Sequence, residues 1–85
     1  MPEISRFLGM SIKMLFGDHE PPHVHILDSG AKSKVDFEGN VLSGFIPENK
    51  LKILSRWLLQ HRSELDMNWI KVVNDEKPER IEPWE

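Results

Sequence analysis

The hydrophobic period of this sequence changes once, at Pro47, and this change constrains the fold more than any other feature. Between residues 10 and 46, apolar and polar residues alternate in short runs, which is the period of strands. Between residues 47 and 73, apolar residues recur every three or four positions, which is the period of a helix with one buried face. Strands in one block followed by helices in another predict the α+β class, with a small antiparallel sheet covered on one face.

Three to four strands are expected in the first block. Alternation predicts strands over residues 10–16, 23–27 and 32–38, and a shorter one over residues 41–46 that Gly44 weakens. The third strand should turn one face to the core, and that face carries Ser33, Val35 and Phe37.

The second block predicts either one kinked helix or two helices. A single helix over residues 47–73 would be roughly 40 Å long, which is long for a small domain. We therefore expect a break between Gln60 and Ser63. The apolar stripe consists of Leu51, Leu54, Leu58, His61, Leu65, Trp69 and Val72. A histidine on such a stripe is more often a packing residue than a ligand, so His61 is interpreted in that way.

The length of 85 residues, 39% of them hydrophobic, suits one small domain with a thin core. We expect this domain to span residues 1–74 and residues 75–85 to form an extended charged tail, anchored by Ile81 and Trp84. The sequence has no cysteine, which excludes disulfides, thiolate zinc sites and a cysteine nucleophile. Its net charge of −3 argues against non-specific binding of duplex DNA, which needs a basic surplus.

The sequence also predicts a cytoplasmic protein that is not bound to a membrane. Its first residues, MPEISRF, lack the basic start and apolar run of a signal peptide. Its apolar stretches are far shorter than the roughly 20 residues that span a bilayer.

The segment FGDHEPPHVHI, residues 16–26, holds three of the four histidines in the chain. Residues two apart on a strand share a face, so the side chains of His23 and His25 should project together. Val24 and Ile26 should then project into the core on the opposite side.

Other polar residues could join the two strand histidines. Asp18 and His19 lie in the preceding loop, where the two prolines force an extended approach to the strand. Lys13 lies on the preceding strand and reaches the same face if the two strands pair in simple register.

These residue types leave three interpretations open. The histidines could belong to a polar surface that only packs and hydrogen-bonds. They could bind a divalent metal such as zinc, with ligands drawn from Asp18, His19, His23 and His25. They could also act without metal, because neighbouring imidazoles can take and give protons near neutral pH. The candidate catalytic residues are then His19, His23 and His25, with Lys13 stabilising a developing anion.

Three parts of the sequence resemble the DUF4160 family, a group of small bacterial proteins of unknown function. These are ISRF at the start, the block DHEPPHVH, and a helical series made of Trp57, His61, Arg62, Glu64, Leu65 and Trp69. The family motif falls on Asp18, His19, Pro21, Pro22, His23 and His25. One departure is Val24, where the family often has an aromatic residue.

The resemblance implies a partner and a functional setting. Members are similar to short reading frames found beside a second small family, DUF2442, in an arrangement like that of toxin–antitoxin pairs. The leading hypothesis is therefore a toxin–antitoxin-like component that acts on RNA through the histidine-rich block. The alternatives are a non-enzymatic module that binds a DUF2442-like protein or a second copy of itself, and a metal-binding domain without catalysis.

Overall fold

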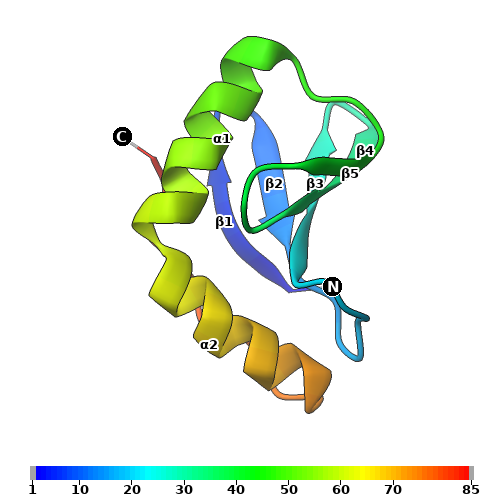
Figure 1. Cartoon of the computed structure of the whole chain (residues 1–85), viewed down its shortest axis with the longest axis vertical. Coiled ribbons are helices and arrows are strands. Elements are labelled where there is room, and N and C mark those ends of the chain that lie inside the picture. The colour runs from blue at the N-terminus through cyan, green and yellow to red at the C-terminus, as the bar shows by residue number, and fades with distance from the viewer. Residues whose placement is uncertain (1, 85) are drawn as a thin grey trace.

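The computed structural model of the chain describes residues 2–84 and shows one antiparallel sheet followed by two helices. The elements are β1 (Glu3–Phe7), β2 (Met10–Lys13), β3 (His23–Asp28), β4 (Ala31–Asp36), β5 (Val41–Ser43), α1 (Glu48–Gln60) and α2 (Arg62–Val73). The strands lie in the order of the sequence, from β1 to β5. Helix α1 lies across one face of the sheet, and α2 continues past the strand ends (Figure 1). The α+β class is confirmed.

The expected number of strands is wrong, because β1 makes five where three to four were predicted. The pairing of β1 with β2 shifts between Glu3 and Ser5, so Ile4 and Ser5 are both fully buried and the alternation is hidden. The turn to β2 uses Leu8 and Gly9, with φ of 52° and 77°. Such turns are usually signalled by asparagine or aspartate before glycine, and a leucine gives no such signal.

Three strands are shorter than the alternation predicts. Strand β2 ends at Lys13, and Met14 then continues as a buried loop residue. Strand β4 ends at Asp36, whose carboxylate accepts N–H groups of the following turn, including that of Asn40 at 2.9 Å. Strand β5 stops at Ser43 because Gly44 has a φ of +79° and lies so close to the backbone of Lys32 that a Cβ would clash there.

The expected break in the helical region is confirmed, and it lies at His61. This residue has φ of −110° and ψ of 25°, between the last residue of α1 and the first of α2. The expected stripe is buried on both helices, at Leu54, Leu58, Leu65, Trp69 and Val72. Because of the break, the two halves of the apolar stripe pack against different parts of the domain. The stripe on α1 covers the sheet, and the stripe on α2 covers the loop that precedes β3.

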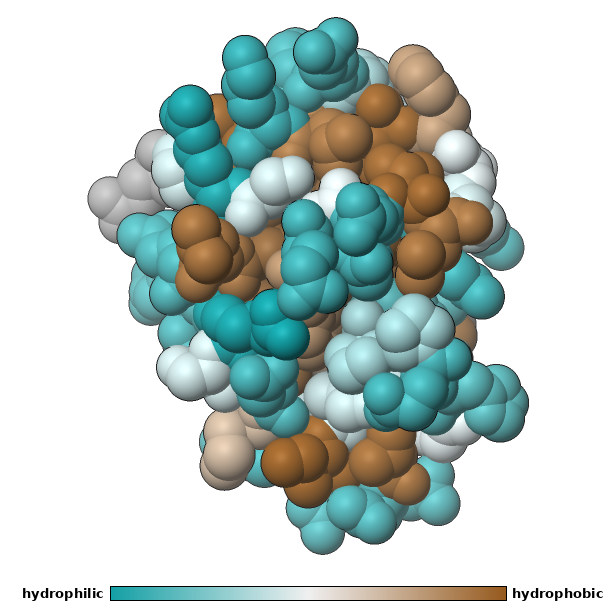
Figure 2. Space-filling view, viewed as in Figure 1, coloured by the Kyte–Doolittle hydropathy of each residue, from teal (hydrophilic) through white to brown (hydrophobic). Residues whose placement is uncertain are grey.

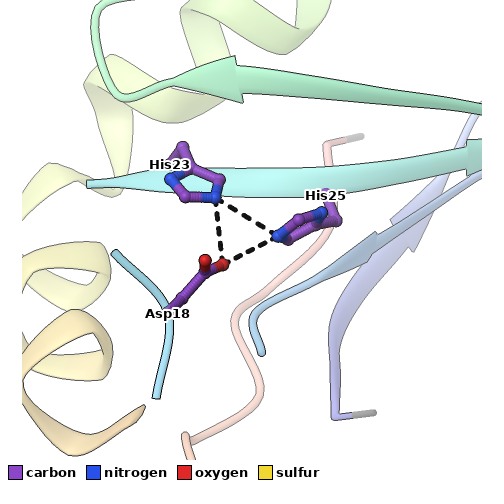
Figure 3. Close-up of side chains that lie close together, drawn as sticks. All are labelled: Asp18, His23 and His25. Atoms are coloured by element: carbon purple, nitrogen blue, oxygen red, sulfur yellow. Dashed lines mark hydrogen bonds and ion pairs between the residues drawn. The ribbon is translucent and has the colours of Figure 1, made fainter. Parts of the chain in front are cut away.

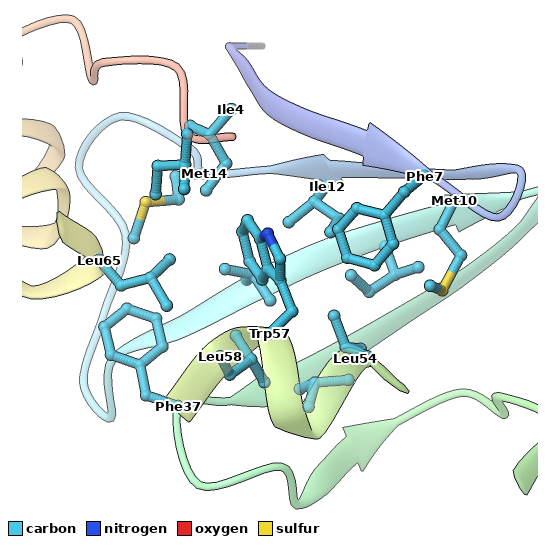
Figure 4. Close-up of a cluster of buried hydrophobic side chains, with 14 of the residues drawn as sticks. Ile4, Phe7, Met10, Ile12, Met14, Phe37, Leu54, Trp57, Leu58 and Leu65 are labelled. Carbon is cyan, nitrogen blue, oxygen red and sulfur yellow. The ribbon is translucent and has the colours of Figure 1, made fainter. Parts of the chain in front are cut away.

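The Trp57 side chain lies at the centre of the core (Figure 4). It is fully buried, and its ring centroid lies 5.2 Å from that of Phe7 on β1. Its indole N–H donates a hydrogen bond of 2.8 Å to the carbonyl of Glu82. This one side chain therefore joins helix, sheet and C-terminal segment.

The segment after α2 is docked on the domain by backbone hydrogen bonds. The buried Asn68 side chain donates to the carbonyl of Glu79 and accepts from its N–H, both at 2.9 Å. The N–H of Ile81 donates to the carbonyl of Ile4 on β1 at 2.7 Å. Ile81 is buried and Trp84 packs against the core, as the sequence predicts. Neither helix combines the length and the apolar character that a membrane-spanning segment needs.

Leu54 and Leu59 on α1 offer a matched test of this core. Leu54 is fully buried and Leu59 is 79% exposed. We expect Leu54→Ala to lower the free energy of unfolding by about 2–5 kcal/mol, because it removes buried methyl groups and leaves a cavity. Leu59→Ala should change it by less than about 0.5 kcal/mol. Urea unfolding of both variants measures the difference, and similar losses would contradict the packing.

The ion pair between Lys50 on α1 and Asp28 on β3 predicts a pH-dependent contribution to stability. The hydrogen bond from Lys50 holds the pKa of the Asp28 carboxyl below its usual range, against the smaller effect of burial. The stabilisation should be complete above the ordinary aspartate pKa of about 3.9 and should disappear as the pH falls through the lowered value.

A double-mutant cycle with Asp28→Asn and Lys50→Gln measures this coupling. We expect a favourable coupling energy at pH 7 that shrinks towards zero at a pH well below the pKa of Asp28. High salt should weaken it, because the pair is partly exposed. A coupling energy that is the same at both pH values would contradict the ion pair.

Candidate functional site

Three side chains from the histidine-rich block point their polar atoms at one another (Figure 3). The Oδ2 atom of Asp18 lies 2.8 Å from Nε2 of His25 and 2.9 Å from Nε2 of His23. The two Nε2 atoms lie 3.2 Å apart. We call Asp18, His23 and His25 the Asp–His–His cluster.

Strand β3 and the loop before it position these three residues. His23 and His25 are two apart on β3 and share a face, while Val24 and Ile26 are buried on the other face, as the period predicts. The loop brings Asp18 to them and is held on α2, because the N–H of Gly17 donates to the carbonyl of Val72 at 2.8 Å.

Trp69 of α2 closes one side of the cluster. Its ring centroid lies 5.5 Å from that of His23, and its indole N–H donates to the carboxylate of Glu20 at 2.8 Å. The His23 side chain is therefore only 5% exposed, whereas that of His25 is 22% exposed. A polar surface is one of the three interpretations that the sequence leaves open, but the structure buries His23 and leaves His25 as the histidine of the cluster that solvent reaches.

The proton positions in the cluster follow from one contact outside it. Nδ1 of His23 lies 2.7 Å from the carbonyl oxygen of Pro21, which can only accept, so Nδ1 carries a proton. In a neutral His23 the Nε2 atom then has a lone pair, which faces the carboxylate of Asp18 at 2.9 Å without a hydrogen between them. Either a second proton on His23 or a bound cation removes this repulsion.

The charge of Asp18 favours a positive partner. Burial acts to raise the pKa of its carboxyl, but the hydrogen bond from His25 and the one from the backbone N–H of His19 lower it. The two imidazoles lower it further when charged, and the net shift is downward. The cluster therefore contains a carboxylate, not a carboxylic acid, at neutral pH.

The cluster has the donor types and spacing of a metal site. Its three ligand atoms lie within 4.8 Å of one another. Cis ligands about 2.0–2.1 Å from an octahedral ion lie roughly 2.9 Å apart, and those on a tetrahedral zinc ion roughly 3.3 Å apart. The observed separations of 2.8–3.2 Å match this range. Two histidines and one carboxylate are found in zinc hydrolases and in non-haem iron sites, both of which leave a coordination position open.

Lys13 lies where the simple register predicts. It is the direct cross-strand partner of His25 on β2, and Lys34 is the partner of His25 on β4. His25, the half-buried histidine of the cluster, therefore lies between two lysines on the sheet face that points away from the core. We call this surface the open face.

The other two histidines lie apart from the cluster. His19 is exposed, and it contributes its backbone N–H to Asp18 at 3.0 Å, while its side chain is not among the converging ligands. His61 bonds the carboxylate of Glu64 at 2.6 Å and packs on Trp57, with 5.4 Å between ring centroids. The interpretation of His61 as a packing residue agrees with these contacts.

Several residues that contact the cluster are not among the candidates that the sequence pattern predicts. The carbonyl of Pro21 and the ring of Trp69 act on His23 through contacts that periodicity does not reveal. Lys34 has a signal in the sequence, because it alternates with the buried Ser33 and Val35 and so must lie on the open face.

The fold and site define a small α+β domain with an Asp–His–His cluster at one end of a five-stranded sheet. The chain matches the model of the family described as "Domain of unknown function (DUF4160)" over residues 9–70, and it belongs to this family. The matched segment contains the cluster, Lys13, Lys34 and Trp69. No curated protein and no solved structure matches the chain.

Proposed function

We propose that this protein binds a divalent metal ion through Asp18, His23 and His25 and acts on RNA at that ion. One observation carries the proposal. The Nε2 atom of His23, whose Nδ1 donates to the Pro21 carbonyl, faces both the Asp18 carboxylate and the Nε2 atom of His25. A single cation would satisfy all three atoms at once.

The surroundings of the cluster support hydrolysis of a phosphodiester. If Asp18, His23 and His25 held a divalent ion, that ion would supply an activated water for the reaction. Hydrolysis would form a bond between the water oxygen and phosphorus, break the bond to the leaving ribose oxygen, and transfer the water proton to that oxygen. Lys13 and Lys34 flank His25 and would stabilise the negative charge that builds on the phosphoryl oxygens.

The same cluster also suits a metal-free mechanism. The contact of 2.8 Å between Asp18 and His25 orients a half-buried imidazole that solvent reaches, as in other pairs where a carboxylate positions a base. His25 could then take a proton from the ribose 2′-hydroxyl, whose oxygen attacks the adjacent phosphorus and expels the 5′ oxygen, which gains a proton. This route requires RNA and no metal, so the two mechanisms differ in measurable ways.

Metal content is the first test. Untagged protein, purified without chelators or nickel resin, should carry one divalent ion per chain in native mass spectrometry. Asp18→Asn and His25→Ala should abolish this stoichiometric ion, because the first removes the anionic carboxylate and the second removes an imidazole ligand. His19→Ala, which removes an exposed imidazole from the same loop, is the matched control and should keep it.

Cleavage of RNA completes this test. Wild-type protein with metal should cleave a labelled RNA, and the variant His23→Ala/His25→Ala should be at least about 100-fold slower. Loss of cleavage in EDTA supports the metal mechanism. Cleavage that survives EDTA and needs the 2′-hydroxyl supports the metal-free one. No cleavage, or equal cleavage by the double variant, would contradict action on RNA.

A non-enzymatic function is the second candidate, and exposed apolar side chains favour it. Apolar surface gathers over β5 and over α2, separated by hydrophilic residues (Figure 2). The residues concerned include Val41, Leu42 and Phe45 near β5, and Met67, Ile70 and Val73 on α2. Phe45 is 76% exposed, an unusual state for an aromatic side chain in a domain with so small a core.

Co-expression of this chain with a DUF2442-like protein tests the second candidate. The family resemblance implies that such a protein is its toxin–antitoxin-like partner. A complex that co-purifies with wild type and is lost in Phe45→Ser or Ile70→Ser would support it. Leu59→Ser, on the exposed side of α1, serves as the control. A chain that remains monomeric and ignores that partner would exclude this function.

A further inference from the structure

The open face carries a row of residues with lysines on both sides of His25, the half-buried histidine of the cluster. Lys13, His25 and Lys34 are direct neighbours on three adjacent strands. Neighbouring strands are about 4.8 Å apart, so the backbones of the two lysines lie roughly 10 Å apart and the imidazole projects between their side chains. Lys32 lies two residues along β4 and is the direct partner of Leu27.

The lysines of this row have no carboxylate partner among the described residues, whereas His25 is paired with Asp18. Lys13, Lys32 and Lys34 form no ion pair with any residue from 2 to 84, whereas Lys50 and Lys71 do. The carboxylates that share the open face are engaged elsewhere. Glu3 accepts hydrogen bonds from Ser11, Arg6 and Arg80, and Asp36 accepts those of its own turn. A chain with a net charge of −3 thus presents a local basic row.

A cavity of about 230 Å³ opens beside the row. It is lined by Lys13, Leu15, His25, Ile26, Leu27, Lys32 and Ser33. Its walls are therefore mainly hydrocarbon, and two of the side chains that line it, those of Lys13 and Lys32, end in an ammonium group. Pockets for drug-sized ligands measure about 300–1,000 Å³, so this cavity suits a single flat ring.

We propose that the open face binds single-stranded RNA, with one unpaired base in the cavity and the neighbouring phosphates on Lys13, Lys32 and Lys34. This inference rests on the proposed action on RNA and names the form of RNA. A base inside a duplex is stacked and paired, so only an unpaired base can enter a cavity in this way. Because His25 lines the cavity, the bound strand passes directly over the Asp–His–His cluster.

The cavity favours RNA over an acidic protein as the occupant. Lysines alone would attract either polyanion. A ring-sized apolar cavity between the lysines fits a polymer that alternates flat rings with phosphates. Contact with the face of a base involves no hydrogen-bond readout, so the preference for a particular base should be weak.

Binding can be tested in EDTA, which separates it from metal-dependent cleavage. Fluorescence anisotropy compares a labelled ten-nucleotide RNA with the same RNA annealed to its complement. We expect the single strand to bind and the duplex to bind at least about tenfold more weakly. Lys13→Gln/Lys34→Gln should lower the affinity about tenfold or more, and should reduce the slope of log K against log salt by about 1.4.

Matched variants control for charge and folding. Lys52→Gln/Arg56→Gln removes the same charge from exposed residues of α1 and should leave binding unchanged. Leu27→Glu places a carboxylate in the cavity and should abolish binding, while Leu59→Glu adds the same charge on α1 and should not. Circular dichroism checks each fold. If Leu27→Glu does not fold, the lysine variants on the exposed surface still decide the outcome.

The outcomes of these experiments separate the binding inference from the proposed cleavage reaction. The inference fails if wild type binds no RNA, if duplex binds as tightly as the single strand, or if Lys13→Gln/Lys34→Gln matches its control. It also fails if a glutamate-rich peptide binds the same face as tightly as RNA does. If the binding inference fails but the protein still cleaves RNA in a metal-dependent way, the proposed function remains supported. Single-strand binding without any cleavage would overturn the proposed reaction and retain the binding face.

Discussion

The buried Trp57 side chain is the contact on which the rest of this structure depends. An 85-residue domain has little interior, so one large side chain must serve several neighbours. Trp57 packs on Phe7 from the first strand and on His61 at the helix break, and its N–H reaches the carbonyl of Glu82. The sheet, α1, the helix break and the last segment thus meet around one indole.

The Asp–His–His cluster depends on a second tryptophan in the same way. Trp69 contacts His23, Phe37 and Glu20, which belong to three separate parts of the chain. Its ring excludes water from one side of the cluster while the open face admits it from the other. Excluding water on one side strengthens electrostatic contacts near the ligand atoms, and solvent access on the other side still permits a substrate to bind.

Periodicity predicts the direction in which a side chain projects, and it does so well here. It places His23 and His25 together and sends Val24 into the core, and the break that helix length predicts between Gln60 and Ser63 lies at His61. It says nothing about what lies opposite a given face, so the burial of His23 under a distant helix is missed. It also fails where the period itself is broken, as at the register shift in β1. The convergence of Asp18 on the histidines depends on loop conformation, which alternation does not encode.

The hydrogen bond between Ile81 and Ile4 has a consequence for biosynthesis. The two residues are joined through the sheet edge although 77 positions separate them. A ribosome adds about 5–20 residues per second, and the amino-terminal residues leave the exit tunnel first. The edge of β1 therefore lacks its hydrogen-bond partner until the segment that carries Glu79 and Ile81 has left the tunnel. Until then Ile4 lacks the donor for its carbonyl and Trp57 lacks the acceptor for its indole N–H, so the last segment completes both the sheet edge and the core.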